Sequence, residues 1–281
     1  MYVDHVFKET FYIEIDDVRL RVYDSGRERE YNNNTTLVFL HGSPGQISNW
    51  KYLVNFFKDE YRVIAYDQRG YGLSDKPRTV SMEDYISDLK KLLGKLGILE
   101  KNVVLVGHSF GGMVAQEFAA RYNIKGLVLI GSLIKLKPDL MDFIIWYLPS
   151  FIWRKILFTE NILTRKAYRD LFFSKKTPDE VFYEFLRDNK DYLESAPAHM
   201  FRYLKYFRNY DATKSLRKIN CPTLIIVGRD DKVTPPSESE NIHKLIKNSK
   251  KEIIEDAGHL VLYEKPDILC KLIGSFIYSL D

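Results

Sequence analysis

The chain has 281 residues, and its 42 Lys and Arg against 38 Asp and Glu give a formal net charge of only +4. Hydrophobic residues make up 45% and charged residues 28% of the sequence, which is typical of a globular protein and argues against disorder. The interspersed charges argue against nucleic-acid binding, and the only two cysteines, Cys221 and Cys270, exclude a disulfide scaffold and a four-cysteine zinc site.

The first nine residues are too polar for a signal peptide. The longest apolar stretch, residues 143–153, is interrupted by Pro149 and is too short to span a bilayer. We therefore expect a cytoplasmic protein without a membrane span. Both cysteines are expected to be buried as small apolar residues.

Strand-like and helix-like segments alternate along most of the chain. Two strands are predicted around the Asp16-Asp17 turn, and helical patterns follow Ser81 and close the chain. Continuous apolar runs, which are typical of strands buried on both faces, occupy residues 37–40, 62–66, 103–106, 127–130 and 224–227. The alternation predicts an α/β fold with a mostly parallel, doubly wound sheet.

Residues 134–215 break this alternation. These 82 residues hold 18 of the chain's 39 aromatic residues and read as several helices bounded by prolines. Because so long an excursion is not a bare loop, we predict a helical cap inserted between two strands of the sheet. The predicted core is then residues 1–133 and 216–281.

The strongest chemical signal is a G-x-S-x-G motif centred on Ser109, between Gly107 and Gly111. It follows a predicted buried strand and opens a predicted helix, which is the context that a nucleophile elbow requires. In such an elbow the serine hydroxyl projects above the sheet, and the amide of Phe110 faces the position of an oxyanion. Ser109 is therefore the candidate nucleophile.

A serine nucleophile needs a base, and the base needs an acid that orients it. His259 follows one predicted strand and is the candidate base, whereas Asp231 follows an earlier strand and is the candidate acid. The chain order of serine, acid and histidine is the one expected for this kind of fold. Spacing alone leaves Asp230 as a rival acid.

Two further loops follow predicted strands. The loop from His41 to Gly45 offers a second oxyanion amide, that of Ser43. His41 and His108 are interpreted as buried orienting residues rather than catalytic ones. In the second loop, Asp67 and the arginine two residues later are expected to brace the loops by ion pairs and hydrogen bonds.

These loops together resemble the signatures of the α/β-hydrolase fold superfamily. The matching segments are H-G-S-P-G, D-Q-R-G-Y-G-L-S-D, G-H-S-F-G-G, G-R-D-D-K-V-T-P and A-G-H-L-V-L-Y-E-K-P. The resemblance runs from about residue 10 to the end of the chain and leaves the cap unmatched. It implies a triad of Ser109, Asp231 and His259, and selects Asp231 over Asp230 because the family's acid usually lies four residues before the proline.

The branch of the superfamily is left open by the motifs. Two loops resemble those of proline iminopeptidases and epoxide hydrolases, but epoxide hydrolases of this fold use an aspartate where this chain has Ser109. The G-H-S-F-G elbow is more similar to those of esterases, C–C bond hydrolases and haloperoxidase-like esterases. Acids of the cap such as Glu180, Glu184 and Glu194 cannot be aligned with the amine-binding acids of the aminopeptidases.

The sequence therefore predicts a serine hydrolase that cleaves an ester or related acyl bond of a small apolar substrate. An aminopeptidase, a C–C bond hydrolase and a non-catalytic ligand receptor are the alternatives. No histidine pair at metal-binding spacing and no phosphate-binding glycine motif occurs, so we expect no metal and no cofactor. The expected partner is a small-molecule substrate, and the oligomeric state is left open.

Overall fold

The computed structural model describes residue 7 and residues 9–27, 29–138, 140–150 and 162–280. Within these ranges eight strands form one sheet in the order β1-β2-β4-β3-β5-β6-β7-β8. Their bounds are β1 Phe11–Ile15, β2 Val18–Asp24, β3 Thr36–Leu40, β4 Arg62–Tyr66, β5 Val103–His108, β6 Gly126–Ile130, β7 Thr223–Gly228 and β8 Ser249–Ile254. The first two strands pair antiparallel and the other six run parallel, which confirms the predicted mostly parallel sheet.

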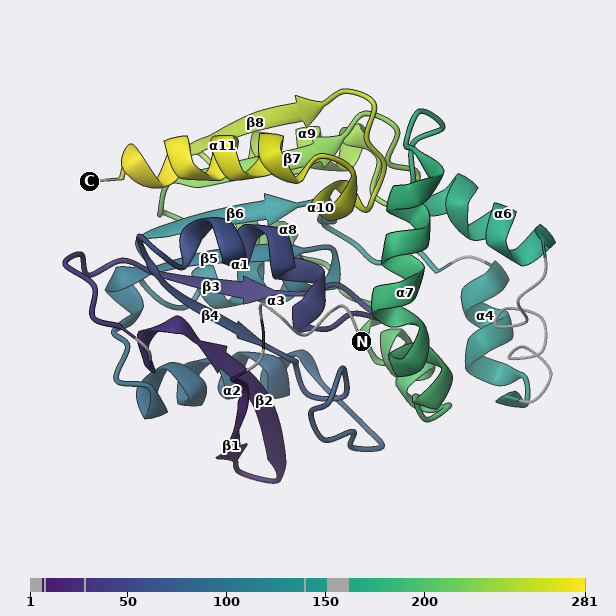
Figure 1. Cartoon of the computed structure of the whole chain (residues 1–281), viewed down its shortest axis with the longest axis horizontal. Helices are drawn as coiled ribbons and strands as arrows, with labels where there is room; N and C mark the ends of the chain where they lie inside the picture. Colours follow the sequence, from purple (N-terminus) through teal and green to yellow (C-terminus); the bar gives the residue numbers. More distant parts are fainter. Residues whose placement is uncertain (1–6, 8, 28, 139, 151–161, 281) are drawn as a thin grey trace.

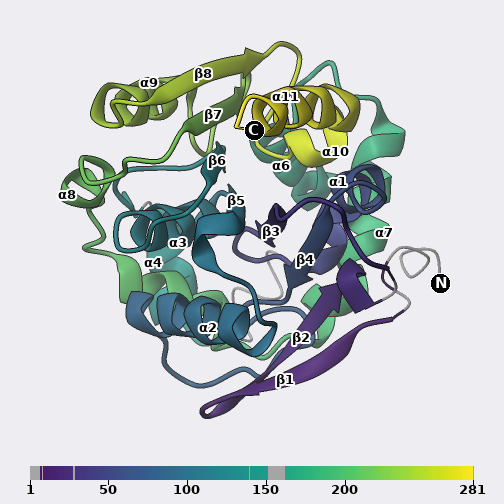
Figure 2. The same ribbon diagram turned by 90° about the vertical axis from the view of Figure 1, so that its left-hand side faces the viewer.

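Helices cover both faces of this sheet (Figures 1 and 2). On one face α2 (Met82–Lys95), α3 (Phe110–Ala119), α8 (Thr213–Leu216) and α9 (Pro236–Leu245) pack on alternate strand residues such as Val38 and Leu105. On the other face α1 (Lys51–Phe57), α10 (Val261–Glu264) and α11 (Pro266–Tyr278) pack on residues such as Phe39 and Val106. The strands are apolar without alternation because both of their faces are buried.

The predicted turn at Asp16-Asp17 and the predicted helix start at Ser81 are both present. Ile15 pairs with Val18 across a two-residue turn, and Asp16 takes a positive φ of 49° in that turn. Ser81 caps α2, because its Oγ accepts the Asp84 amide while the Asp84 carboxylate accepts the Ser81 amide. Short 3₁₀ turns lie at η1 (Ser25–Arg27), η2 (Ile47–Trp50) and η3 (Glu100–Asn102).

The chain between β6 and β7 forms helices. They are α4 (Leu140–Tyr147), α6 (Ile162–Phe172), α7 (Asp179–Ser195) and the 3₁₀ segment η4 (Met200–Phe207), followed by α8. Figure 1 shows α4, α6 and α7 beyond the carboxyl ends of the parallel strands. Residues 151–161 of the predicted cap lie outside the described residues.

The two cysteines differ in burial. Cys270 is buried in α11, as predicted, but Cys221 is only half-buried, because it lies just before β7 and packs against the edge of the core. Most of the polar N-terminal segment, which predicts no signal peptide, lies outside the described residues. In the part of the chain that the structure describes, no helix has the length and apolar character needed to cross a membrane.

Candidate active site

Ser109 lies in a strained turn between β5 and α3. Its backbone has φ 52° and ψ −117°, a conformation that non-glycine residues rarely adopt. The turn is tight enough that a Cβ on Gly111 would lie 2.1 Å from the carbonyl oxygen of Leu40. A Cβ on Gly107 would lie 2.6 Å from the carbonyl oxygen of Gly111. Neither position has room for a side chain, which explains why the motif has glycine at both.

Asp231 and His259 are hydrogen-bonded to each other. Asp231 follows β7, His259 follows β8, and Asp231 Oδ2 lies 2.9 Å from His259 Nδ1. Both residues are buried, at 3% and 4% exposure. The rival acid Asp230 is exposed, and its carboxylate accepts a hydrogen bond from Ser174 Oγ instead.

Further donors hold the Asp231 carboxylate in its charged form. Its Oδ1 accepts the amides of Val233 and Thr234 at 2.9 and 2.8 Å, and its Oδ2 accepts the Thr234 hydroxyl at 2.8 Å. Burial alone would raise the pKa of Asp231, but His259 and these bonds outweigh it and lower the pKa below the usual range. Sequence reasoning missed Thr234, although a hydroxyl three residues after an acid is a common turn signal.

Ser109 is connected to this pair through the end of β6. The Ser109 amide donates to the carbonyl oxygen of Ile130 at 2.9 Å. The next residue, Gly131, is so close to the pair that a Cβ would lie 3.2 Å from Asp231 Oδ2 and 3.3 Å from His259 Nδ1. Within the described chain no hydrogen bond joins Ser109 Oγ to His259, and such bonds are often long before substrate binds.

Two backbone N–H groups lie next to Ser109 and donate to no acceptor among the described residues. A Cβ on Gly42 would lie 3.3 Å from Ser109 Cβ, so the loop that carries Ser43 passes directly beside the serine. Among the described residues the amides of Ser43 and Phe110 have no acceptor. The Ser43 hydroxyl lies 2.8 Å from the Tyr71 hydroxyl, a contact that sequence reasoning did not find.

The other two histidines of these loops are buried and orient the backbone. His41 Nδ1 donates to the Gly42 carbonyl, while its Nε2 accepts the Gln68 amide at 3.0 Å. His108 Nε2 donates to the carbonyl oxygen of His259 at 2.9 Å, and the two rings are 4.8 Å apart. Burial lowers the pKa of His41, and burial together with His259 lowers that of His108 to about 3, so both stay neutral.

Asp67 and Arg69 brace the loops, as the sequence predicted. The Asp67 carboxylate accepts the amides of Ile47 and Leu73, each at 2.7 Å. Arg69 makes a two-pronged ion pair with Asp88 of α2 at 2.7 and 2.8 Å. Among the described residues, neither side chain forms a hydrogen bond or ion pair with Ser109 or His259.

The loop that carries His259 is tied to the helical segment on both sides of the histidine. The half-buried carboxylate of Glu264 accepts the amides of Gly258 and Ser174, each at 2.8 Å. The amide of Leu260 donates to the Phe172 carbonyl at 3.1 Å. The Phe172 ring lies 6.1 Å from the His259 ring. Burial raises the pKa of Glu264, against the effect of these hydrogen bonds.

A second polar cluster joins α7 to α1. Lys51 Nζ lies 2.5 Å from Glu184 Oε1 and 2.6 Å from Asp188 Oδ2. Tyr52 donates to the same Glu184 carboxylate, and the buried Asn189 contacts both Gln46 and Asn49. Of the acids considered from the sequence, Glu184 is therefore already paired with a lysine, while Glu180 and Glu194 are exposed.

No cluster of three or more His, Cys, Asp or Glu side chains that could hold a metal ion occurs among the described residues. The chemistry that the arrangement offers is instead nucleophilic: a strained serine, a histidine oriented by an ionised aspartate, and two free amides.

Comparisons with known proteins identify the family of the fold. The sequence profile described as "alpha/beta hydrolase fold" matches residues 35–266. A proline iminopeptidase of Saccharolobus solfataricus is 31% identical over 90% of this chain and 89% of its own length. A human protein named epoxide hydrolase 4 is 28% identical over 95% of this chain and 78% of its own.

Solved structures are also similar. A thermophilic esterase from Thermogutta terrifontis superposes with a TM-score of 0.79 at 25% identity, and the match covers 97% of this chain and 99% of that one. The similar proteins therefore share one fold but carry different activities in their names.

Proposed function

Because this chain belongs to the α/β hydrolase fold family, we propose that it is a serine hydrolase cleaving a carboxylic ester or related acyl bond. The substrate would be small and apolar, and the reaction would pass through an acyl-enzyme intermediate. The observation that carries the proposal is the hydrogen bond between buried Asp231 and His259, beside a serine in a strained elbow.

In the proposed reaction Ser109 Oγ attacks the carbonyl carbon while His259 Nε2 takes its proton. Asp231 stays ionised, holds the proton of His259 on Nδ1, and stabilises the imidazolium that forms. His259 then gives the proton to the departing alcohol as the tetrahedral intermediate collapses to the acyl-enzyme. Water, deprotonated by the same histidine, hydrolyses the acyl-enzyme and releases the acid.

The negatively charged oxygen of each tetrahedral intermediate would accept hydrogen bonds from the amides of Ser43 and Phe110. Their lack of other acceptors within the described chain supports this role. Losing one such donor typically lowers kcat by about 10²–10³-fold.

The helical segment between β6 and β7 would act as a cap that selects the substrate. Its residue Phe172 brings an aromatic ring to within 6.1 Å of the His259 ring, which favours an apolar group near the base. The bounds of this cap, residues 134–215, are part of the same proposal.

Serine at the elbow separates this chain from hydrolases that use an aspartate there. The epoxide hydrolases among its relatives are therefore similar in fold, while Ser109 favours acyl chemistry. An aminopeptidase is the second candidate, supported by the similarity to a proline iminopeptidase. It needs an acid that holds the substrate amine, and the pairing of Glu184 with Lys51 argues against that residue.

The test is a panel of initial rates on p-nitrophenyl esters from acetate to laurate, with free and N-blocked proline p-nitroanilide beside them. We expect rapid ester cleavage that Ser109→Ala abolishes without changing the circular dichroism spectrum or the melting temperature. Full activity of Ser109→Ala would disprove the proposal. Cleavage of the free prolyl anilide alone would establish the aminopeptidase instead.

A further inference from the structure

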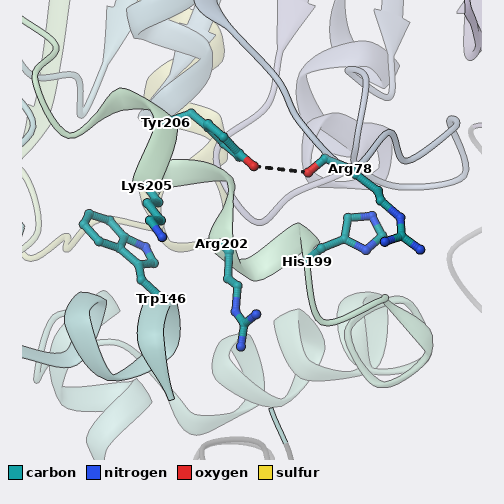
Figure 3. Close-up of a pocket in the computed structure, with 6 residues that line it drawn as sticks. All are labelled: Arg78, Trp146, His199, Arg202, Lys205 and Tyr206. Atoms are coloured by element: carbon teal, nitrogen blue, oxygen red, sulfur yellow. Dashed lines mark hydrogen bonds between the residues drawn. The ribbon is translucent and has the colours of Figure 1, made fainter. Parts of the chain in front are cut away.

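A pocket of about 360 Å³ lies where η4 meets α4 and the loop before α2 (Figure 3). Six residues line it: Arg78, Trp146, His199, Arg202, Lys205 and Tyr206. None of the residues of the candidate active site is among them. The pocket is therefore a separate place on the molecule.

The described part of this pocket is positively charged. Of the six described residues that line it, three are cationic and none is acidic. No carboxylate of the described residues lies within 4.0 Å of the charged groups of Arg78, Arg202 or Lys205, although arginines elsewhere in the chain, such as Arg69, are paired. Three like charges around one hollow repel each other, so an anion there would be stabilised.

Two of the cations are held in place before any ligand arrives. Arg202 donates from Nε to the carbonyl of Ile145 at 3.2 Å and from Nη2 to that of Leu148 at 2.8 Å. These bonds use two of the five guanidinium N–H groups and leave the others for a ligand. Lys205 Nζ lies 4.2 Å from the centre of the Tyr147 ring.

Aromatic side chains form the rest of the wall. Trp146 is buried at 3% exposure, whereas Tyr206 is 48% exposed and donates a 3.4 Å hydrogen bond to the Arg78 carbonyl, shown dashed in Figure 3. His199 Nε2 lies 3.1 Å from the carbonyl oxygen of Lys76, and its Nδ1 has no hydrogen-bond partner among the described residues. An apolar or planar group can pack on such a wall while its charged end meets the cations.

We propose that this pocket binds a small organic anion, with a phosphate or carboxylate head contacting Arg78, Arg202 and Lys205 and an apolar body against Trp146 and Tyr206. The inference does not depend on the proposed acyl hydrolysis. It follows from uncompensated charge, fixed donors and an aromatic wall meeting in one hollow.

Titration calorimetry with phenyl phosphate tests the proposal on the full chain. Benzoate tests the carboxylate head, inorganic phosphate tests the head without a body, and benzyl alcohol tests the body without a charge. We expect saturable binding of phenyl phosphate or benzoate, weaker binding of inorganic phosphate, and none of benzyl alcohol.

The variants Arg78→Gln and Lys205→Gln should each weaken binding by about five- to tenfold, because each removes one charged donor. Arg202 is left intact because it also supports the end of α4. Lys250→Gln, which removes one exposed charge from β8, is the matched control and should leave binding unchanged.

The proposal would be overturned if neither phenyl phosphate nor benzoate bound saturably. It would also be overturned if the double variant Arg78→Gln and Lys205→Gln bound as tightly as the wild type, or if Lys250→Gln weakened binding as much as the pocket variants do. Ester hydrolysis measured on Arg78→Gln, which lies outside the proposed cap, keeps the two proposals apart, since a loss of anion binding there should leave that rate unchanged.

Discussion

At the candidate active site, burial and neighbouring groups together decide which side chains carry charge. Asp231 stays ionised because His259, Thr234 and two amides outweigh the effect of burial on its pKa. His108 stays neutral because burial and His259 both disfavour its protonated form. The site therefore has one fixed negative charge, on Asp231, and a neutral imidazole at His108.

The two neighbouring acids give a direct test of the triad. Asp231→Asn should lower kcat by about 10⁴-fold, because the amide favours the wrong tautomer of His259. Asp230→Asn is the matched control and should keep a kcat close to that of the wild type, since Asp230 is exposed and bonds to Ser174. Ester hydrolysis measures both, and a larger loss in Asp230→Asn would exclude the assignment.

The neutral histidines predict how stability depends on pH. Unfolded histidine binds a proton below about pH 6.5, whereas folded His108 binds one only near pH 3. Stability is therefore full above pH 6.5 and falls as the pH is lowered, by about 1.4 kcal/mol per pH unit for each such group. The lowered pKa of buried His41 acts in the same direction.

Urea denaturation between pH 7 and pH 4 measures this slope. His108→Gln keeps a donor for the His259 carbonyl but cannot titrate, so its slope should be shallower than that of the wild type. An unchanged slope in the variant would show that His108 does not contribute.

At the level of elements, α10 fixes the loop of the base to the helical segment. Glu264 is the last residue of α10, and its two oxygens join Gly258 to Ser174. A Cβ on Gly258 would lie 2.7 Å from the Phe172 carbonyl oxygen, so the two segments are in direct backbone contact. The position of His259 therefore depends on the helical segment as well as on β8.

Glu264→Gln should weaken this junction. The NH₂ group of the glutamine would replace one of the two oxygens, so one backbone N–H would lose its acceptor. That loss costs about 1–3 kcal/mol in the free energy of unfolding. A shift of the His259 loop should lower kcat by about tenfold or more while KM changes little. Steady-state kinetics and urea denaturation are the measurements.

Thr177→Val is the matched control for Glu264→Gln. It removes one hydroxyl donor from the same carboxylate but leaves both backbone bonds in place. Its kcat should stay within about threefold of the wild type, because only the backbone bonds hold the loop. Equal losses in the two variants would argue against a role for those backbone bonds.

The elements were largely predictable from the sequence, and the reasons are visible in individual residues. Strands such as β3 and β5 are continuous apolar runs, and the context of Ser109 between a strand and a helix follows from the same pattern. The bonds from Tyr71 to Ser43 and from Ser174 to Glu264 were not found, because these partners lie far apart in the chain. Thr234 was missed although Asp231 lies only three residues before it. The pocket lined by Arg78 likewise joins segments far apart in the chain.

In the whole molecule, α7 is fastened to the core by a polar cluster. Lys51 bridges Glu184 and Asp188, with side-chain exposures of 15%, 25% and 5%. Burial raises the pKa of Asp188 even with Lys51 beside it, whereas for Glu184 the bonds from Lys51 and Tyr52 outweigh burial and lower the pKa. The cluster makes the helical segment and the sheet depend on each other for stability.

Lys51→Met should therefore destabilise the protein by about 2 kcal/mol or more, because it leaves two neighbouring carboxylates without their cation. Lys91→Met, which breaks an exposed pair with Asp16, is the matched control and should cost at most about 1 kcal/mol. Urea denaturation monitored by circular dichroism measures both. Equal losses would mean that the cluster contributes no more than a surface pair.

The order of the strands has a consequence for how the protein is made. β6 and β7 are neighbours in the sheet, but residues 131–222, 92 residues in all, lie between them in the chain. At about 5–20 residues per second, a ribosome needs about 5–18 s to make that stretch, while β6 waits as an open edge. An open edge strand can pair with another chain, so aggregation of nascent protein should begin there. During that interval Ser109 already exists, but Asp231 and His259 have not yet been synthesised.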